Sequence, residues 1–262
     1  MGFLVLGVLI TLFIMYSNHL FFLVESYRLK KHVVKLAPIY QNSQLQAEPS
    51  FCSLQPYSKV WAHRVNTLER FLFLSSHFQG FEMDIMFDER GNFLDVRHPP
   101  ATSIHLSFER YLQAAESKGK FFWLDVKNLT DSNEASVLNC FMRLNNRYRI
   151  QQRIIVESDN IIALSKISDA GYFTSYYYNW NSYNNFVNNN NEAFRNTVLK
   201  KIDAVSQDVL LYDTLLNRFP LKPRLTWALS IKNYWSDSLF TSLDHDKQLL
   251  VYLVNIRSPH YR

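Results

Sequence analysis

Acidic and basic side chains with spacings that suit catalysis are concentrated between residues 61 and 127. Glu82 and Asp84 stand two positions apart in the strand-like run GFEMDIMF, so both side chains point to one face of that strand. Two carboxylates that face one interior repel each other and lose hydration, and a bound divalent cation is the simplest compensation. A salt bridge from this pair to Arg64 or Lys127 is the alternative.

A second strand-like run, KFFWLDV, repeats the pattern. Trp123, Asp125 and Lys127 fall on one face, and Asp125 would supply a third oxygen ligand. Carboxylates form a hard anionic donor set of the kind that Mg²⁺ or Ca²⁺ prefers, whereas Zn²⁺ would more often recruit histidines. Lys127 would then be a fixed positive charge for an oxygen atom of a phosphate group.

Histidines end two of the strand-like runs. His63 ends KVWAH, and His98 ends NFLDVRH. Since imidazole exchanges protons near neutral pH, the pair suits a general base and a general acid on opposite sides of a phosphorus atom, with Arg64 as a clamp for a phosphate oxygen. The segment DERGN predicts a hairpin turn in which Gly91 takes a positive φ and folds His98 back towards the acidic pair.

Strand-like and helix-like segments alternate from residue 58 onwards. Strands that alternate with helices imply βαβ units and a parallel sheet, and about eight such units in about 200 residues favour an α/β fold of the (β/α)8 TIM-barrel type. We expect Ser107, Asp131 and Asp159 to cap helices, and the asparagine-rich stretch 179–194 to form a surface loop. The strand candidates are 59–63, 80–87, 92–98, 120–126, 153–158, 172–178, 202–208, 224–230 and 249–256.

The amino-terminal run 2–24 contains no Asp, Glu, Lys or Arg. A helix of this length crosses a bilayer core of about 30 Å. We therefore expect a single-pass membrane protein with a transmembrane anchor over 1–25, a linker over 26–57 and a barrel over 58–262; a cleaved signal peptide is the alternative. The basic residues between Arg28 and Lys35 favour a cytoplasmic barrel, but the flank is short and either orientation stays open.

The composition excludes several classes of protein. With only 6 glycines, a glycine-rich phosphate loop is not available, and the scattered net charge of +5 argues against nucleic-acid binding. The sequence contains no G-x-S-x-G, H-E-x-x-H or paired C-x-x-C motif. Cys52 and Cys140 lack metal-ligand spacing; a disulfide between them stays open, and we expect Cys140 to be a buried apolar residue.

The motifs H-R, N-T-L-x-x-F, G-F-E-M-D-I, D-E-R-G-N and the later histidine together resemble the glycerophosphodiester phosphodiesterases, within the phospholipase-C-like phosphodiesterase superfamily. The resemblance covers about 59–259. It implies a (β/α)8 barrel whose mouth holds a divalent metal through carboxylates, while two histidines act as base and acid and a neighbouring substrate hydroxyl attacks the phosphodiester. The pattern falls on catalytic His63 and His98, phosphate-binding Arg64 and Lys127, and metal-binding Glu82, Asp84 and Asp125.

Two departures from the family pattern bear on function. Val65 replaces the glycine expected after His-Arg, and the loop that carries Pro-Glu before Asn-Thr is missing. W-x-H-x-V-N, H-P-P and L-D-V-K look closer to the menorin-like branch, and H-x-V-N is also similar to the sphingomyelinase-D-like enzymes. Combined with the predicted anchor, the resemblance implies a membrane-anchored, metal-dependent phosphodiesterase that hydrolyses glycerophosphodiesters or phospholipid head groups. The alternatives are a barrel without catalysis that binds a partner or lipid at the membrane, and a purely structural membrane protein with internal salt bridges.

Overall fold

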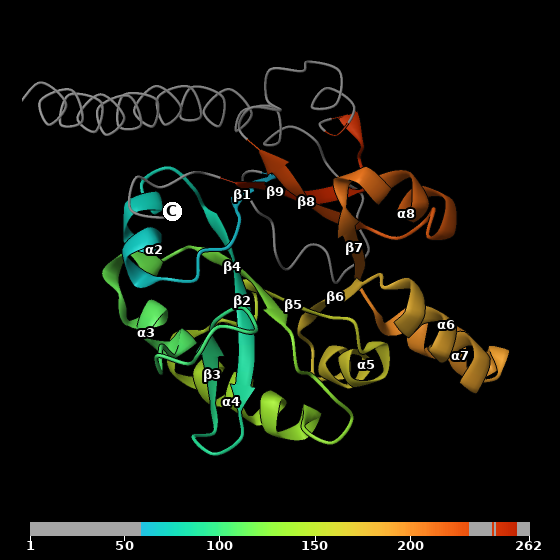
Figure 1. Cartoon of the computed structure of the whole chain (residues 1–262), viewed down its shortest axis with the longest axis horizontal. Helices are drawn as coiled ribbons and strands as arrows, with labels where there is room; N and C mark the ends of the chain where they lie inside the picture. The colour runs from blue at the N-terminus through green and yellow to red at the C-terminus, as the bar shows by residue number, and fades with distance from the viewer. Residues whose placement is uncertain (1–58, 231–242, 244, 256–262) are drawn as a thin grey trace, which may run out of the picture.

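A computed structural model describes residues 59–230, 243 and 245–255 of the chain. It contains a single sheet whose strands form a ring (Figure 1). The strands are β1 (Val60–Ala62), β2 (Gly80–Asp88), β3 (Phe93–Val96), β4 (Phe121–Val126), β5 (Ile154–Ser158), β6 (Phe173–Tyr177), β7 (Ala204–Asp208), β8 (Arg224–Ser230) and β9 (Leu249–Asn255). Eight of them run parallel, and β1 closes the ring by pairing with both β2 and β9. β3 adds to the outer part of β2 as an antiparallel hairpin partner.

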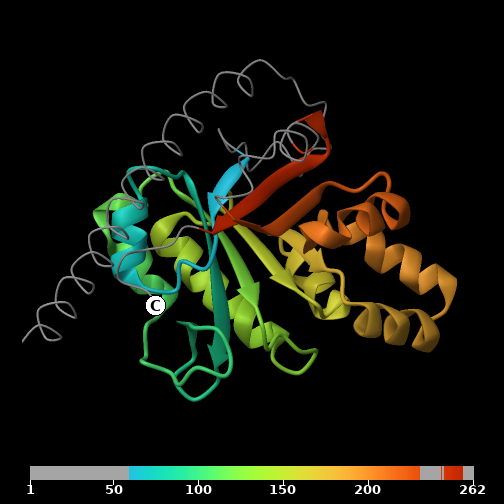
Figure 2. The same cartoon turned by 45° about the horizontal axis from the view of Figure 1, so that its top comes forward.

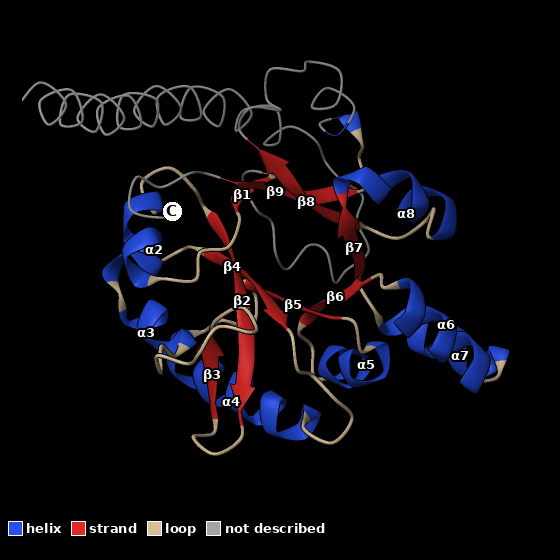
Figure 3. Ribbon diagram, in the orientation of Figure 1, coloured by secondary structure: helices blue, strands red, loops and turns tan. Residues whose placement is uncertain are grey.

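Helices cover the outside of the ring (Figures 2 and 3). They are α2 (Leu68–Leu74), α3 (Phe108–Gln113), α4 (Glu134–Tyr148), α5 (Ile161–Asp169), α6 (Trp180–Asn189), α7 (Glu192–Lys201) and α8 (Tyr212–Arg218), with the 3₁₀ turns η2 (Ala115–Ser117) and η3 (Val209–Leu211). Parallel strands joined by outer helices are the βαβ arrangement that the alternation predicts, so the (β/α)8 barrel is confirmed.

The strand alternation divides the core into two layers. On β4, Phe122 and Leu124 pack outwards beneath the helices, whereas Trp123 belongs to a separate cluster inside the ring. Ile155 and Phe173 join Trp123 in that inner cluster from the next two strands. Because side chains on a strand alternate between faces, residues of the same parity as Trp123 project into the barrel.

Gly80, the first residue of β2, lies against the ring of Trp61 on β1. A Cβ atom added to Gly80 would stand 2.0 Å from the Cδ2 atom of Trp61. Trp61 is fully buried and its ring centroid lies 6.0 Å from that of Phe121, so little room is left for it to shift. Glycine is therefore what allows β1 and β2 to approach where the ring closes.

Gly80→Ala should lower the free energy of unfolding by about 3 kcal/mol, the upper part of the range for overpacked cores. Thermal unfolding followed by circular dichroism measures the effect. Gly91→Ala is the control, because its new Cβ would meet the ring of Phe93, which is only partly buried at the hairpin and has room to turn. Equal losses of melting temperature in both variants would contradict the packing argument.

The expected surface loop over 179–194 is wrong, because most of the stretch belongs to α6 and the start of α7. Its asparagines act as helix caps: Asn179 accepts from the backbone N–H groups of Asn181 and Ser182, and Asn191 accepts from that of Phe194. The few apolar residues suffice to attach α6 to the core, with Phe186 buried. Caps at the ends and one apolar stripe outweigh the low helix propensity of asparagine.

The β2–β3 hairpin forms as predicted, but its turn uses a different residue. Asn92, and not Gly91, has the positive φ, at 48°, and the Gly91 N–H donates to Asp88 Oδ1 at 2.8 Å. Asparagine tolerates the left-handed region better than most residues.

The expected helix caps are partly wrong. Ser107 caps α3 as predicted, although its side chain accepts no cap hydrogen bond. Asn133 and Asn160 cap α4 and α5 in place of Asp131 and Asp159. The Asn160 side chain accepts from the Ala163 N–H, which an aspartate one position earlier does not reach here. In both cases the cap lies one or two positions nearer the helix than predicted.

Two expectations concern residues outside the described ranges. The predicted membrane segment 2–24 lies there, and within the described residues no helix has both the length and the apolar character needed to cross a bilayer. Cys52 also lies outside the described ranges. Cys140 is buried with a free thiol, as expected for a small apolar residue.

Candidate active site

The three predicted acids lie together at the carboxyl ends of the barrel strands, here called the mouth. Glu82 and Asp84 lie on β2 and Asp125 lies on β4, with Asp84 opposite Asp125 in the parallel pair. All three side chains are buried, and each offers a carboxylate oxygen within 4.8 Å of the others. Strand parity aims them into the barrel, which brings acids from two strands to one point.

Two side chains hold the Asp84 carboxylate. The Asn66 amide nitrogen donates to Asp84 Oδ2 at 2.6 Å, and the Asp84 N–H donates back to Asn66 Oδ1 at 2.9 Å. Lys127 Nζ lies 3.1 Å from Asp84 Oδ1 and also donates to Asp125 Oδ2. The salt bridge to Lys127 that was an alternative to a cation is therefore present, but one lysine offsets only part of the charge of three acids.

Glu82 is held from the loop that follows β1. The Arg64 backbone N–H donates to Glu82 Oε2 at 2.7 Å, and His63 Nε2 lies 3.6 Å from the same oxygen. Arg64 has a φ of 54°, a left-handed conformation that costs energy in a residue with a side chain. The left-handed backbone conformation therefore occurs at Arg64, the residue whose N–H donates to Glu82. The Arg64 side chain is exposed beside the mouth.

His63 is oriented by the last strand of the barrel. Its Nδ1 lies 2.8 Å from the side-chain oxygen of Asn255, at the end of β9. Because an amide oxygen only accepts, this contact keeps the proton on Nδ1 and leaves a lone pair on Nε2. Burial, together with the charge of Arg64, lowers the pKa of His63 to about 4, so the ring is neutral at neutral pH. A neutral and oriented imidazole can act as a general base.

The pKa values of the acids indicate that Lys127 does not fully compensate the charge of their ionised forms. Burial, with repulsion from Asp84 and Asp125, raises the pKa of Glu82 well above its usual value. Burial also raises the pKa of Asp125 to about 6, although Lys127 opposes the shift. Burial acts to lower the pKa of Lys127, but Asp125 and Asp84 outweigh it and hold that pKa above the ordinary value. The donor set fits a divalent cation, since such an ion would compensate the charge that the lysine leaves.

A fourth buried acid, Glu157 on β5, lies in register with Asp125. The hydroxyl groups of Ser206 and Ser175 donate to Glu157 Oε2, the latter at 3.3 Å. Burial, with repulsion from Asp125, raises the pKa of Glu157 well above its usual value. The sequence motifs predict no role for Glu157. The signal that could have found it is a carboxylate of the same parity as the inward-facing Ile155 on an apolar strand.

The sequence motifs also predict no role for Asn66 or Asn255. They contact Asp84 and His63 across 18 and 192 residues of chain, respectively. No local pattern marks either asparagine, so only the closed barrel shows that they position Asp84 and His63.

Aromatic rings stand beside the acids at the mouth. The Trp227 ring on β8 lies 5.2 Å from that of Tyr177 on β6 and 6.3 Å from that of Trp123 on β4, in both cases edge to face. Burial, and after it the nearby charge of Glu157, raises the pKa of the Tyr177 hydroxyl. These rings give the polar site a wall that suits the organic part of a ligand.

His98 lies at the rim of the mouth. The Arg97 N–H donates to the Asp84 carbonyl oxygen at 2.9 Å, so the hairpin returns the chain to β2. The His98 ring is exposed, and its Nδ1 contacts the carbonyl oxygen of Pro99. Of the two predicted histidines, the structure therefore brings His63 into contact with the acids and leaves the ring of His98 turned to solvent beside them.

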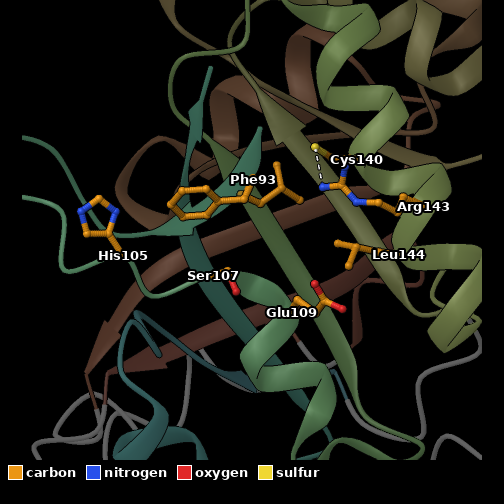
Figure 4. Close-up of a pocket in the computed structure, with 8 residues that line it drawn as sticks. Phe93, His105, Ser107, Glu109, Cys140, Arg143 and Leu144 are labelled. Atoms are coloured by element: carbon orange, nitrogen blue, oxygen red, sulfur yellow. Dashed lines mark hydrogen bonds between the residues drawn. The ribbon is translucent and has the colours of Figure 1, made fainter. Parts of the chain in front are cut away.

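A cavity of about 250 Å³ lies away from the mouth, between the hairpin and α4 (Figure 4). Phe93 and Arg143 are among its lining residues. Arg143 donates to the Asn92 carbonyl oxygen at 2.8 Å, and the Cys140 thiol donates to the same oxygen at 3.4 Å. These contacts fasten the hairpin turn to α4. None of the predicted site residues lines this cavity.

Solved structures share this barrel, although the sequence matches no protein-family model and no curated protein. A phosphodiesterase from Oleispira antarctica in complex with the product sn-glycerol-3-phosphate is 10% identical, with a TM-score of 0.56 over 78% of this chain and 94% of that one. The glycerophosphodiester phosphodiesterase from Parabacteroides distasonis is 14% identical, with a TM-score of 0.55 over 75% and 92%. That from Thermotoga maritima is 13% identical, with a TM-score of 0.54 over 75% and 93%.

This is the fold of the glycerophosphodiester phosphodiesterases. The resemblance in the sequence motifs and the likeness of the barrel point to the same group of proteins. At identities this low the likeness concerns the fold, and the chemistry of the mouth follows from its own residues.

Proposed function

We propose that the chain is a metal-dependent phosphodiesterase that hydrolyses glycerophosphodiesters or phospholipid head groups. The observation that carries the proposal is the cluster of Glu82, Asp84 and Asp125 beside a neutral, oriented His63. The Oleispira phosphodiesterase, which shares the fold, was solved with the product sn-glycerol-3-phosphate. That complex supports a phosphodiester as the substrate class.

Glu82, Asp84 and Asp125 would hold the divalent cation, Mg²⁺ or Ca²⁺. When bound, the cation supplies positive charge that polarises the phosphoryl oxygens. Lys127 and Arg64 are the protein's own cations for the phosphate: Lys127 adjoins the acids, and Arg64 extends from the loop after β1. The wall of Tyr177 and Trp227 would contact the alcohol group of the diester.

His63 would act as the general base. Its Nε2 accepts the proton of the attacking hydroxyl, which belongs to the substrate or to water, while Nδ1 keeps its proton against Asn255. The imidazolium that forms lies 3.6 Å from Glu82 Oε2, and Glu82, ionised as a ligand of the cation, would stabilise the positive charge. Asn255 therefore fixes which nitrogen takes up the proton.

His98 would act as the general acid, protonating the leaving oxygen from the rim of the mouth. His98→Ala should then lower turnover of an alkyl phosphodiester about a hundredfold, within the usual range for acid catalysis. Turnover of an aryl diester that releases p-nitrophenolate should fall by less than about threefold, because that leaving group departs without a proton. Steady-state rates on both substrates measure the difference.

His105→Ala is the control, since His105 is also exposed and lies in the same loop after β3. It should change neither rate. Equal losses on alkyl and aryl substrates in His98→Ala would show that His98 positions the chain and does not donate the proton.

The anchor over 1–25 and the linker over 26–57 complete the proposal and lie outside the described ranges. An anchored barrel would act on diesters at or near a lipid surface. Protease protection of tagged termini in sealed vesicles tests the single span and gives its orientation.

The activity itself is tested with the full chain purified in detergent. Glycerophosphodiesters and lysophospholipids are supplied with Mg²⁺, with Ca²⁺ or with a chelator, and the released alcohol is measured. Turnover that requires both the metal and His63 is the expected result. If no substrate is hydrolysed and His63→Ala and His98→Ala leave the cellular phenotype unchanged, the barrel is a binding protein, the alternative that Val65 suggests.

A further inference from the structure

The Lys127 ammonium group is paired with carboxylate oxygens that would otherwise coordinate a divalent cation. Its Nζ lies 3.1 Å from Asp84 Oδ1 and donates to Asp125 Oδ2. Both acids belong to the cluster whose oxygens lie within 4.8 Å of one another. An ammonium group and a divalent cation repel each other strongly at such separations, because buried charges are poorly screened by solvent and salt.

We propose that Lys127 is a built-in counter-ion that a divalent cation displaces from Asp84 and Asp125, and that the displaced ammonium group then binds the phosphate of the ligand. The inference rests on the cation site of the proposed function and adds an order of binding. The cation comes first, since its arrival releases the ammonium group. Phosphate comes second.

The backbone at Lys127 allows the side chain to move by itself. Lys127 directly follows the last residue of β4, and its N–H donates to the Ile85 carbonyl oxygen at 2.9 Å. This bond fastens the Cα atom to the mouth. The side chain is 25% exposed, so its end has access to the opening of the barrel. The flexible aliphatic stem of lysine can carry the ammonium group from the acids to a phosphate above them.

The exchange would let Lys127 serve the site twice: it stabilises the acids before the cation binds, and it supplies positive charge for phosphate afterwards. Buried carboxylates without a counter-charge would drive one another apart, and Lys127 keeps them assembled before the cation arrives. In that state the ammonium group is engaged with Asp84 and Asp125, so phosphate is offered less positive charge. Arg64 differs, because its exposed side chain makes no ion pair with these acids among the described residues.

Calorimetric titration of the full chain in detergent tests the exchange. Mg²⁺ and Ca²⁺ are titrated separately into wild type, Lys127→Met and the control Lys118→Met, which removes the same charge from an exposed position ahead of β4. Lys127→Met should bind the cation at least tenfold more tightly than wild type, and Lys118→Met should match wild type. In a chelator, Lys127→Met should melt at a lower temperature than Lys118→Met.

Inorganic phosphate provides a second measurement, made on wild type and on Lys127→Met. Wild type should bind phosphate at least tenfold more tightly in saturating Mg²⁺ than in a chelator. Lys127→Met in Mg²⁺ should bind it more weakly than wild type, because the ammonium group is missing.

The outcomes separate the inference from the proposed function. Equal cation affinities in wild type and Lys127→Met, or phosphate binding that does not respond to Mg²⁺ in wild type, would overturn the inference and leave the metal-dependent enzyme standing. No cation binding in any of the proteins would overturn the proposed cation site as well. If Lys127→Met does not fold, Lys127→Gln, which also removes the ammonium group, replaces it in both titrations.

Discussion

Asp84→Asn should abolish binding of the divalent cation and lower phosphodiesterase turnover about a thousandfold, or about 4 kcal/mol in activation free energy. Asparagine keeps the shape of the side chain and removes the charge at the centre of the acidic cluster. Asp84 is the acid opposite Asp125 and in contact with Lys127, so its loss removes a ligand and leaves the lysine with one partner fewer. Cation calorimetry and steady-state rates measure the two effects.

Asp88→Asn is the matched control. Asp88 ends the same strand with the same parity, but it lies at the hairpin turn and accepts from the Gly91 N–H. It should retain cation binding and turnover. Full activity in Asp84→Asn would show that the cluster is a structural ion-pair network.

His63→Gln should lower turnover about a thousandfold while cation affinity changes little, because the base is lost and the acids remain. Glutamine keeps an amide near Asn255 but takes up no proton at neutral pH. His245→Gln, a change at an exposed histidine, should leave turnover unchanged. A His63→Gln protein with wild-type turnover would exclude His63 as the base.

The same substitution should change how stability depends on pH. The pKa of His63 is lowered from 6.5 to about 4 by burial and Arg64, so between these values the unfolded chain binds a proton that the folded chain does not. His63 therefore reduces the free energy of unfolding as pH falls through this window, by about 3 kcal/mol at its lower end. The buried acids with raised pKa values act in the opposite sense. The informative quantity is thus the difference between wild type and His63→Gln, which should grow below pH 6.5 and vanish above it.

Strand parity was sufficient to predict the acidic cluster. Glu82 and Asp84 share a face, and so do Trp123 and Asp125, so each strand delivers its acids to the barrel interior. Parallel pairing then places acids from neighbouring strands side by side. The alternation of strands and helices predicted the barrel for the same reason, because periodicity is a local property that the sequence carries directly.

Features that depend on closure or on competing local preferences were not predictable. The asparagines of 179–194 disfavour a helix by propensity, yet α6 forms because its caps and its few buried residues find partners. The roles of Asn66 and Asn255 depend on contacts between distant segments. Whether the His98 ring turns towards Asp84 or to solvent depends on rotation within a short loop, which spacing along the chain does not determine.

The contact between His63 and Asn255 joins the first strand of the barrel to the last, across 192 residues. During synthesis on the ribosome, the nascent chain carries its base long before it carries the amide that orients it. The proposed hydrolytic activity should therefore appear only once β9 has emerged and docked. A chain clipped by a protease ahead of that strand should keep His63 but lack the amide that orients it, and with it the proposed activity.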